Sequence, residues 1–269
     1  MIIIKSDEEI AAMRISCQLA ASVRDRVASQ IRPGATTGEL DAYAAELIAA
    51  AGAKSAFLGY KGFPGNVCLS VNDEVVHGIP GNRRIEIGDI VSLDVGVHHG
   101  GFVGDTAVTI MVGVTDAEVM RLVDATQSAL RAGIDNAVVN GRLGDISHAI
   151  EVVAQRAGFS IVREFVGHGV GRSMHEDPQV PNFGTAGKGP RLRHGMTLAI
   201  EPMVNLGVAE VQVMDDGWTV LTGDRKPSAH FEHTVAILDG GPEILTVSDV
   251  LAEESAAVSN FVVDERRDS

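Results

Sequence analysis

The sequence has few cysteines, no long apolar run and no excess of positive charge. Its 269 residues include two cysteines, Cys17 and Cys68, which form neither a dense disulfide framework nor a C-x-x-C metal motif. No segment approaches the roughly 20 apolar residues that a membrane-spanning helix requires, and the start Met1–Lys5 is too short and too soon charged for a signal peptide. We therefore expect a cytoplasmic protein with no membrane partner and no disulfide.

The charge balance is acidic, with a formal net charge of −14 at pH 7. Binding to nucleic acid phosphates or to an anionic membrane requires clustered Lys and Arg, so no nucleic acid binding is expected. Hydrophobic residues make up 45% and charged residues 22% of the chain, as in ordinary folded proteins. Length permits one large domain or two small ones. We expect a single domain over 1–269, with 248–269 as a peripheral tail.

Helical and strand patterns alternate along the chain. A capping box, Ser6 with Glu9, precedes apolar helical spacing. The predicted helices are 7–30, 37–51, 116–133 and 143–157, and the predicted strand regions are 66–76, 90–112 and 161–247. The order helix, sheet, helix, sheet favours an α+β fold of two similar halves, with antiparallel sheets covered by helices, although no direct sequence repeat supports a duplication.

Two aspartates lie in adjacent predicted strands. Asp94 ends the run Ile-Val-Ser-Leu, and Asp105 precedes Thr-Ala-Val-Thr-Ile, on either side of a turn predicted at 98–101. An axis between His99 and Gly100 would place the two carboxylates directly opposite each other, where like charges repel. A cation bound by both would remove that repulsion.

Two more carboxylates, Glu201 and Glu232, and His168 have equally apolar or glycine-rich surroundings. An isolated acidic residue is normally a solvated surface group, but burying an unpaired charge is costly. Four carboxylates therefore predict two divalent cations, and the added histidine suits Mn, Fe, Co or Zn. The glycines around His168 lack the G-x-G-x-x-G spacing and the P-loop lysine, which argues against a nucleotide site.

Three further side chains are candidates on weaker grounds. His77 and His175 each precede a turn that contains proline, where a loop histidine bonded to backbone is an equally good interpretation. His175 is not part of an H-E-x-x-H motif. Trp218, the one tryptophan, could line a pocket, but local sequence favours simple packing.

The motifs together closely resemble those of the bacterial type I methionine aminopeptidases, which have a pseudo-two-fold "pita-bread" α+β fold. The resemblance covers nearly the whole chain. The matching segments are KSDEEIAAMR (5–14), FLGYKGFP (57–64), NDEVVHGIP (72–80), GHGVGR (167–172), HEDPQV (175–180), IEPM (200–203) and FEHT (231–234).

The resemblance implies roles for these residues. One metal would be held by Asp94, Asp105 and Glu232, and the other by Asp105, His168, Glu201 and Glu232. A shared water would attack the carbonyl after an N-terminal methionine, with Glu201 as proton acceptor, while His77 and His175 would hold the substrate. The implied methionine pocket consists of Phe57, Tyr60, Phe63, Cys68 and Trp218. Phe57, Lys61 and Met174 differ from the residues common in relatives, which bears on pocket size and substrate preference.

The implied activity is removal of the initiator methionine from nascent polypeptides, near the ribosome, when the next residue is small, by an enzyme expected to be a monomer. Xaa-Pro aminopeptidases and prolidases use the same five ligand positions and are the nearest alternative. They usually carry an added N-terminal domain, whereas this chain starts directly at the catalytic unit. A second alternative is a non-catalytic pita-bread binding protein, but such proteins typically lose metal ligands.

Overall fold

The computed structural model describes residues 1–248, so all but the first residue of the predicted tail lies outside the described residues. Four long helices form close to their predicted ends: α1 (Asp7–Ala28), α2 (Thr37–Ala50), α3 (Ala117–Asp135) and α4 (Leu143–Arg156). The expected capping box of Ser6 and Glu9 begins α1, and Thr36 with Glu39 forms another before α2. Asp116 caps α3 through two backbone N–H groups. These side chains satisfy N–H groups that would otherwise be unpaired.

Every pairing between the strands described in residues 1–248 is antiparallel. The main sheet has nine strands in the order β1-β4-β5-β14-β9-β7-β8, with β2 also paired to β4 and β15 to β14. Its strands are β1 (Lys54–Ser55), β2 (Cys68–Val71), β4 (Ile90–His99), β5 (Phe102–Met111), β7 (Gly167–Gly169), β8 (Glu176–Val180), β9 (Thr197–Ile200), β14 (Glu232–Leu238) and β15 (Gly241–Ile244).

Two small sheets and one short helix complete the fold. One sheet has the order β13-β10-β6 and the other β11-β12-β3. These strands are β3 (Glu74–Val76), β6 (Ser160–Ile161), β10 (Met203–Asn205), β11 (Val211–Val213), β12 (Val220–Thr222) and β13 (Ser228–His230). The short helix η1 (Tyr60–Gly62) is of the 3-10 type.

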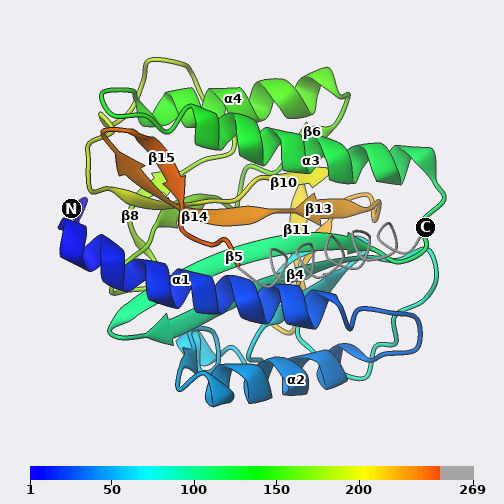
Figure 1. Ribbon diagram of the computed structural model, residues 1–269. Helices are drawn as coiled ribbons and strands as arrows, with labels where there is room; N and C mark the ends of the chain where they lie inside the picture. Colours follow the sequence, from blue (N-terminus) through cyan, green and yellow to red (C-terminus); the bar gives the residue numbers. More distant parts are fainter. Residues whose placement is uncertain (249–269) are drawn as a thin grey trace, which may run out of the picture.

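The helices divide between two halves of the molecule. Figure 1 shows α1 and α2 beside β4 and β5, and α3 with α4 at the other end. One buried apolar cluster joins α1 and α2 to β2 and β4, and another joins α3 and α4 to β9 and β14. Each half therefore has its own helix pair and core, and the two halves share the main sheet.

The β4–β5 hairpin has a different register from the predicted one. Asp94 pairs with Ala107, and Asp105 pairs with Gly96. The turn consists of Gly100 and Gly101, whose φ angles of 58° and 84° favour glycine at both positions of a two-residue hairpin turn. The prediction that the two aspartates lie directly opposite each other is wrong, because the turn begins one residue later than expected. They lie diagonally on one face of the hairpin.

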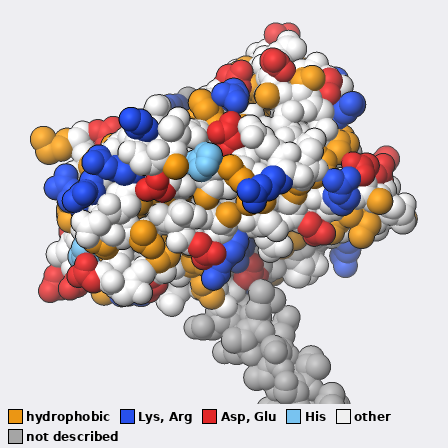
Figure 2. All heavy atoms as spheres, turned by 90° about the horizontal axis from the view of Figure 1, so that it is seen from above, with side chains coloured by type: hydrophobic (Ala, Val, Ile, Leu, Met, Phe, Trp, Pro, Cys, Tyr) orange, Lys and Arg blue, Asp and Glu red, His pale blue; other side chains and the backbone are white. Residues whose placement is uncertain are grey.

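Over residues 1–248, no helix is both long and apolar enough to cross a membrane. Cys17 and Cys68 are buried free thiols. Figure 2 shows one face of the molecule, on which Lys and Arg side chains are interspersed with Asp and Glu and do not gather into a single patch.

Candidate metal centre and pocket

The main sheet brings the five predicted ligands together from both halves of the chain. Asp94 lies in β4, Asp105 in β5, His168 in β7 and Glu232 at the start of β14, while Glu201 directly follows β9. Ala107 pairs with Asp94 on one side and with Glu232 on the other. Residues two apart on a strand share a face, so Asp105 lies on the same face as Ala107. This small side chain leaves space between the carboxylates.

His168 is oriented toward the carboxylates. Its Nδ1 lies 2.9 Å from the carbonyl oxygen of Gly169, so Nδ1 carries the proton and donates it, leaving Nε2 as a free lone pair. Nε2 lies 3.6 Å from Oδ2 of Asp105 and 3.5 Å from Oε1 of Glu201. Asp105, His168 and Glu232 offer ligand atoms that all lie within 4.8 Å of one another. These separations suit atoms that share one ion.

The carboxylates are buried without cationic partners. Oδ1 of Asp94, Oδ1 of Asp105 and Oε1 of Glu232 are buried and accept no hydrogen bond from residues 1–248. Burial raises the pKa of Asp94 to about 7 and that of Glu201 to about 8. Burial, reinforced by neighbouring carboxylates, raises the pKa of Asp105 and of Glu232 well above the usual range. Within residues 1–248 no Lys or Arg pairs with any of the four, and divalent cations fit this deficit.

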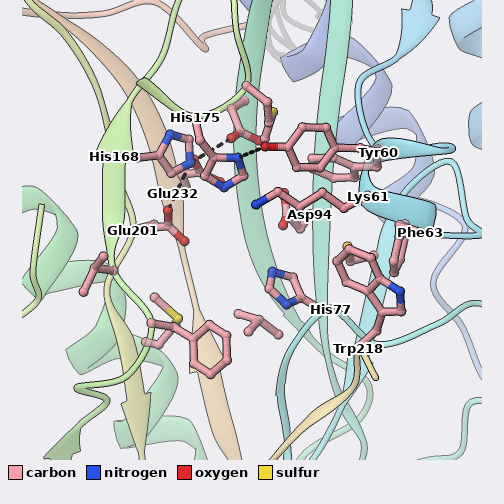
Figure 3. A pocket seen from close by; sticks show the side chains of 18 residues that line it. Tyr60, Lys61, Phe63, His77, Asp94, His168, His175, Glu201, Trp218 and Glu232 are labelled. Atoms are coloured by element: carbon pink, nitrogen blue, oxygen red, sulfur yellow. Dashed lines mark hydrogen bonds and ion pairs between the residues drawn. The ribbon is translucent and has the colours of Figure 1, made fainter. Parts of the chain in front are cut away.

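An open pocket of about 820 Å³, part of it solvent at the mouth, adjoins the carboxylates. Its apolar wall includes Phe57, Phe63, Cys68 and Trp218. The ring of Phe63 meets those of Trp218 and Phe57 edge to face, at centroid distances of 5.1 and 6.5 Å. Figure 3 shows this aromatic wall across the cavity from His168 and Glu201. Trp218 therefore lines the pocket, contrary to the packing role that its local sequence favours.

The two candidate histidines lie on either side of the cavity. His175 stacks on Tyr60, and its Nδ1 lies 2.9 Å from the tyrosine hydroxyl. The centroid of its ring lies 4.2 Å from that of His168. His77 meets Trp218 edge to face at 6.0 Å. Burial lowers the pKa of His77 to about 4, and burial followed by the charge of Lys61 lowers the pKa of His175. Both imidazoles are therefore neutral at pH 7.

All twelve predicted site residues line this single pocket, together with residues that the sequence did not indicate. The additional ones are Val76, Phe165, Val166 and Met203. His230 is a further addition, buried behind Glu201 with its Nε2 3.5 Å from Oε2 of that residue. Its motif, Ser-Ala-His-Phe, contains no signal of a site, because the contact is made between distant strands.

Comparison with known proteins decides the family. The model of metallopeptidase family M24 matches residues 11–239. The chain belongs to metallopeptidase family M24. Among curated M24-type relatives, a methionine aminopeptidase of Clostridium perfringens is 50% identical over 247 residues, covering 92% of this chain and 99% of the relative. Methionine aminopeptidase 1 of Bacillus subtilis is 47% identical over 246 residues, covering 91% and 99%.

Solved structures agree. The crystal structure of a methionine aminopeptidase from Thermotoga maritima has a TM-score of 0.90 at 46% identity and covers 91% of this chain and 99% of that one. A prolidase from Pyrococcus furiosus has a TM-score of 0.73 at 22% identity, which shows a shared fold alone, and this chain spans 65% of it. The predicted pita-bread α+β fold, the family resemblance and the metallopeptidase class are confirmed.

Proposed function

We propose that this M24 enzyme removes the N-terminal methionine from nascent polypeptides, preferentially when the next residue is small. The observation that carries the proposal is the convergence of five ligand-type side chains beside an apolar pocket, in a chain about half identical to methionine aminopeptidases over nearly its whole length. We expect the chain to act in the cytoplasm near the ribosome, as a monomer formed by one domain over 1–269.

The residues present fit two divalent cations, Co, Mn, Fe or Zn. Asp94, Asp105 and Glu232 would hold one, and Asp105, His168, Glu201 and Glu232 the other. The resemblance implies that Asp105 and Glu232 would serve both, and these two residues lie on the neighbouring strands β5 and β14. Bound cations supply an acidified water and polarise the scissile carbonyl.

Glu201 is suited to proton transfer. Burial raises the pKa of Glu201 to about 8 in the metal-free protein, and a bound cation would lower it again by favouring the ionised carboxylate, which can then accept a proton. Its side chain is 14% exposed, so a proton can reach it from the pocket. In this proposal Glu201 accepts the proton of the attacking water and returns it to the leaving amine.

His77 and His175 hold the substrate in the proposed mechanism. Each is neutral because its pKa is lowered by burial, so each can donate one N–H. Nδ1 of His175 lies 2.9 Å from the Tyr60 hydroxyl, and in the proposed tautomer it accepts from that hydroxyl while Nε2 carries the proton. Such donors stabilise negative charge that develops on the substrate carbonyl.

The apolar wall suits a methionine side chain. Methionine is flexible and polarisable, and its sulfur contacts aromatic rings favourably. Phe63 and Trp218 offer such rings, and Cys68, 4% exposed, closes the wall with a small side chain. Burial raises the pKa of the Cys68 thiol well above its usual range, so this cysteine contributes a neutral surface.

The decisive experiment is cleavage of a peptide panel by the metal-reconstituted enzyme. We expect Met-Ala and Met-Gly peptides to be cleaved faster than Ala-Pro peptides, for each of Co, Mn, Fe and Zn that supports activity. Asp105→Asn should abolish turnover and metal binding while circular dichroism shows a folded chain. Faster cleavage of Ala-Pro peptides would instead favour an Xaa-Pro peptidase. Full metal occupancy without any peptidase activity would favour a binding protein.

A further inference from the structure

Lys61 stands at the mouth of the pocket with its charge unpaired. It is exposed, lines the cavity and lies next to Tyr60 in η1. Figure 3 shows its side chain extending into the cavity with the ammonium group turned toward His175. Across residues 1–248, Lys61 is the one Lys or Arg that lines this pocket. Its Nζ has no carboxylate within 4.0 Å there and lies 5.3 Å from the centroid of the Tyr60 ring.

The backbone fixes this position. Lys61 has a φ of 48°, between Gly59 at 79° and Gly62 at 90°. A left-handed conformation is unfavourable for a side chain such as lysine, so the surrounding turn must hold it. The N–H of Gly59 donates to the carbonyl of Phe63 at 2.8 Å, and the N–H of Phe63 donates to that of Tyr60 at 2.9 Å. The closed turn directs Tyr60 and Lys61 to the same cavity.

A bound peptide must pass this ammonium group. The apolar wall and the carboxylates occupy the inner part of the pocket, so the residues that follow an N-terminal methionine leave through the mouth. The ammonium group of Lys61 extends into the cavity that such a peptide crosses. A charged side chain on the departing peptide comes under the influence of this charge, because fields are weakly screened in a narrow site.

We propose that Lys61 selects substrates by charge, favouring peptides with an acidic residue shortly after the methionine and disfavouring peptides with a basic one. The inference rests on the proposed function and adds a substrate class to it. Lys61 attracts the acidic peptide and repels the basic one, so both effects increase the preference for the acidic peptide. Exposed charge pairs are individually weak, and we expect about a fivefold preference for acidic over basic peptides at low salt.

The test compares Met-Ala-Glu, Met-Ala-Gln and Met-Ala-Lys peptides, all with amidated C-termini so that no terminal carboxylate can reach Lys61. In the wild type the ratio of kcat/KM for the Glu and Lys peptides should be about five. Lys61→Gln should bring this ratio close to one, and Lys61→Glu should invert it. Lys188→Gln is the matched control, because Lys188 is exposed and absent from the pocket lining, and its ratio should equal that of the wild type.

Binding provides a second readout that does not depend on turnover. Trp218 is the single tryptophan and lines the pocket, so its fluorescence can report binding of the same peptides with a reduced, uncleavable first bond. An unchanged ratio of Kd and of kcat/KM in Lys61→Gln, with all peptides cleaved, overturns the role of Lys61 and leaves the proposed function intact. If no Met-Ala peptide is cleaved, the proposed function fails, and the binding ratio alone decides the role of Lys61.

Discussion

His230 shows how much of this site depends on a single buried side chain. It is 1% exposed, and its Nε2 has no hydrogen-bond partner among the described residues and lies 3.5 Å from Oε2 of Glu201. His168 approaches Oε1 of the same carboxylate at 3.5 Å, so Glu201 lies between two imidazoles. Thr109 donates its hydroxyl to the carbonyl of His230 at 2.7 Å and accepts from its N–H at 2.9 Å. We therefore expect His230 to act as a positioning residue for Glu201.

Replacing His230 should separate positioning from packing. His230→Ala removes the side chain that confines Glu201, and we expect kcat to fall about tenfold with little change in KM, as for loss of a contact to a charged group. His230→Gln keeps a donor of similar reach and should recover most of the loss. Steady-state kinetics on a Met-Ala peptide will measure both, with circular dichroism as the check on folding. Equal losses in the two variants would contradict a positioning role.

The sequence indicated the five candidate ligands because each charge interrupts a run of apolar or glycine residues, and that local contrast does not depend on the fold. His230 gave no such signal, and Lys61 was indicated only by its departure from the residues common in the resembling family. The importance of His230 arises from Glu201, 29 residues earlier on a different sheet, and that of Lys61 from a backbone turn with positive φ. Tertiary proximity of this kind is absent from local sequence patterns.

At the scale of elements, helices were more predictable than strand register. The helices begin at side-chain caps that are visible in the sequence, such as Ser6 with Glu9. The hairpin register depends on which two residues of His-His-Gly-Gly form the turn, and a shift of the turn by one residue moves every pair. The energetic preference of Gly100 and Gly101 for positive φ decides the outcome.

Strand β5 serves two purposes on its opposite faces. Asp105 is directed to the pocket, while the adjacent Gly104 lies against α1. A Cβ at Gly104 would be 2.5 Å from the Cα of Cys17 and 2.6 Å from the carbonyl oxygen of Ser16. The helix can approach the strand this closely because residue 104 has no side chain.

Gly104→Ala should therefore separate α1 from β5. We expect the free energy of unfolding to fall by about 2–3 kcal/mol, because backbone atoms must move to relieve the overlap. Urea denaturation will measure the change. Gly240→Ala is the matched control, since a Cβ there meets nothing within 4 Å, and it should change stability far less. A similar loss in both variants would show that the close approach of α1 is unimportant.

At the scale of the whole molecule, the site lies where the two halves meet, and its charge affects global stability. The folded-state pKa values of about 7 for Asp94 and about 8 for Glu201 lie above the unfolded values of about 4. Between these limits the folded metal-free protein binds more protons than the unfolded chain. The contribution of these two groups to the stability of the folded state is therefore greatest below about pH 4, and it falls as the pH rises to about 8.

Metal-free protein, prepared with a chelator, should thus lose stability between pH 5 and pH 8. The double variant Asp94→Asn with Glu201→Gln removes these two titrations and should show a shallower decline under the same conditions. Thermal unfolding followed by circular dichroism at several pH values will give both slopes. Identical slopes of stability against pH in the two proteins would mean that these two carboxyls do not carry the burial cost. In the wild type, excess divalent cation should reverse the loss of stability with rising pH.

The place of β14 in the main sheet has a consequence for synthesis on the ribosome. This strand lies between β5 and β9, yet it begins only at Glu232, 121 residues after β5 ends at Met111. Until β14 emerges, the inner edge of β5 has no partner and carries unpaired backbone groups that another chain could join. Helix α1 is made before β5 and can cover one face of that strand, but it leaves the edge of the strand open. Truncated chains that end before β14 should therefore associate with one another.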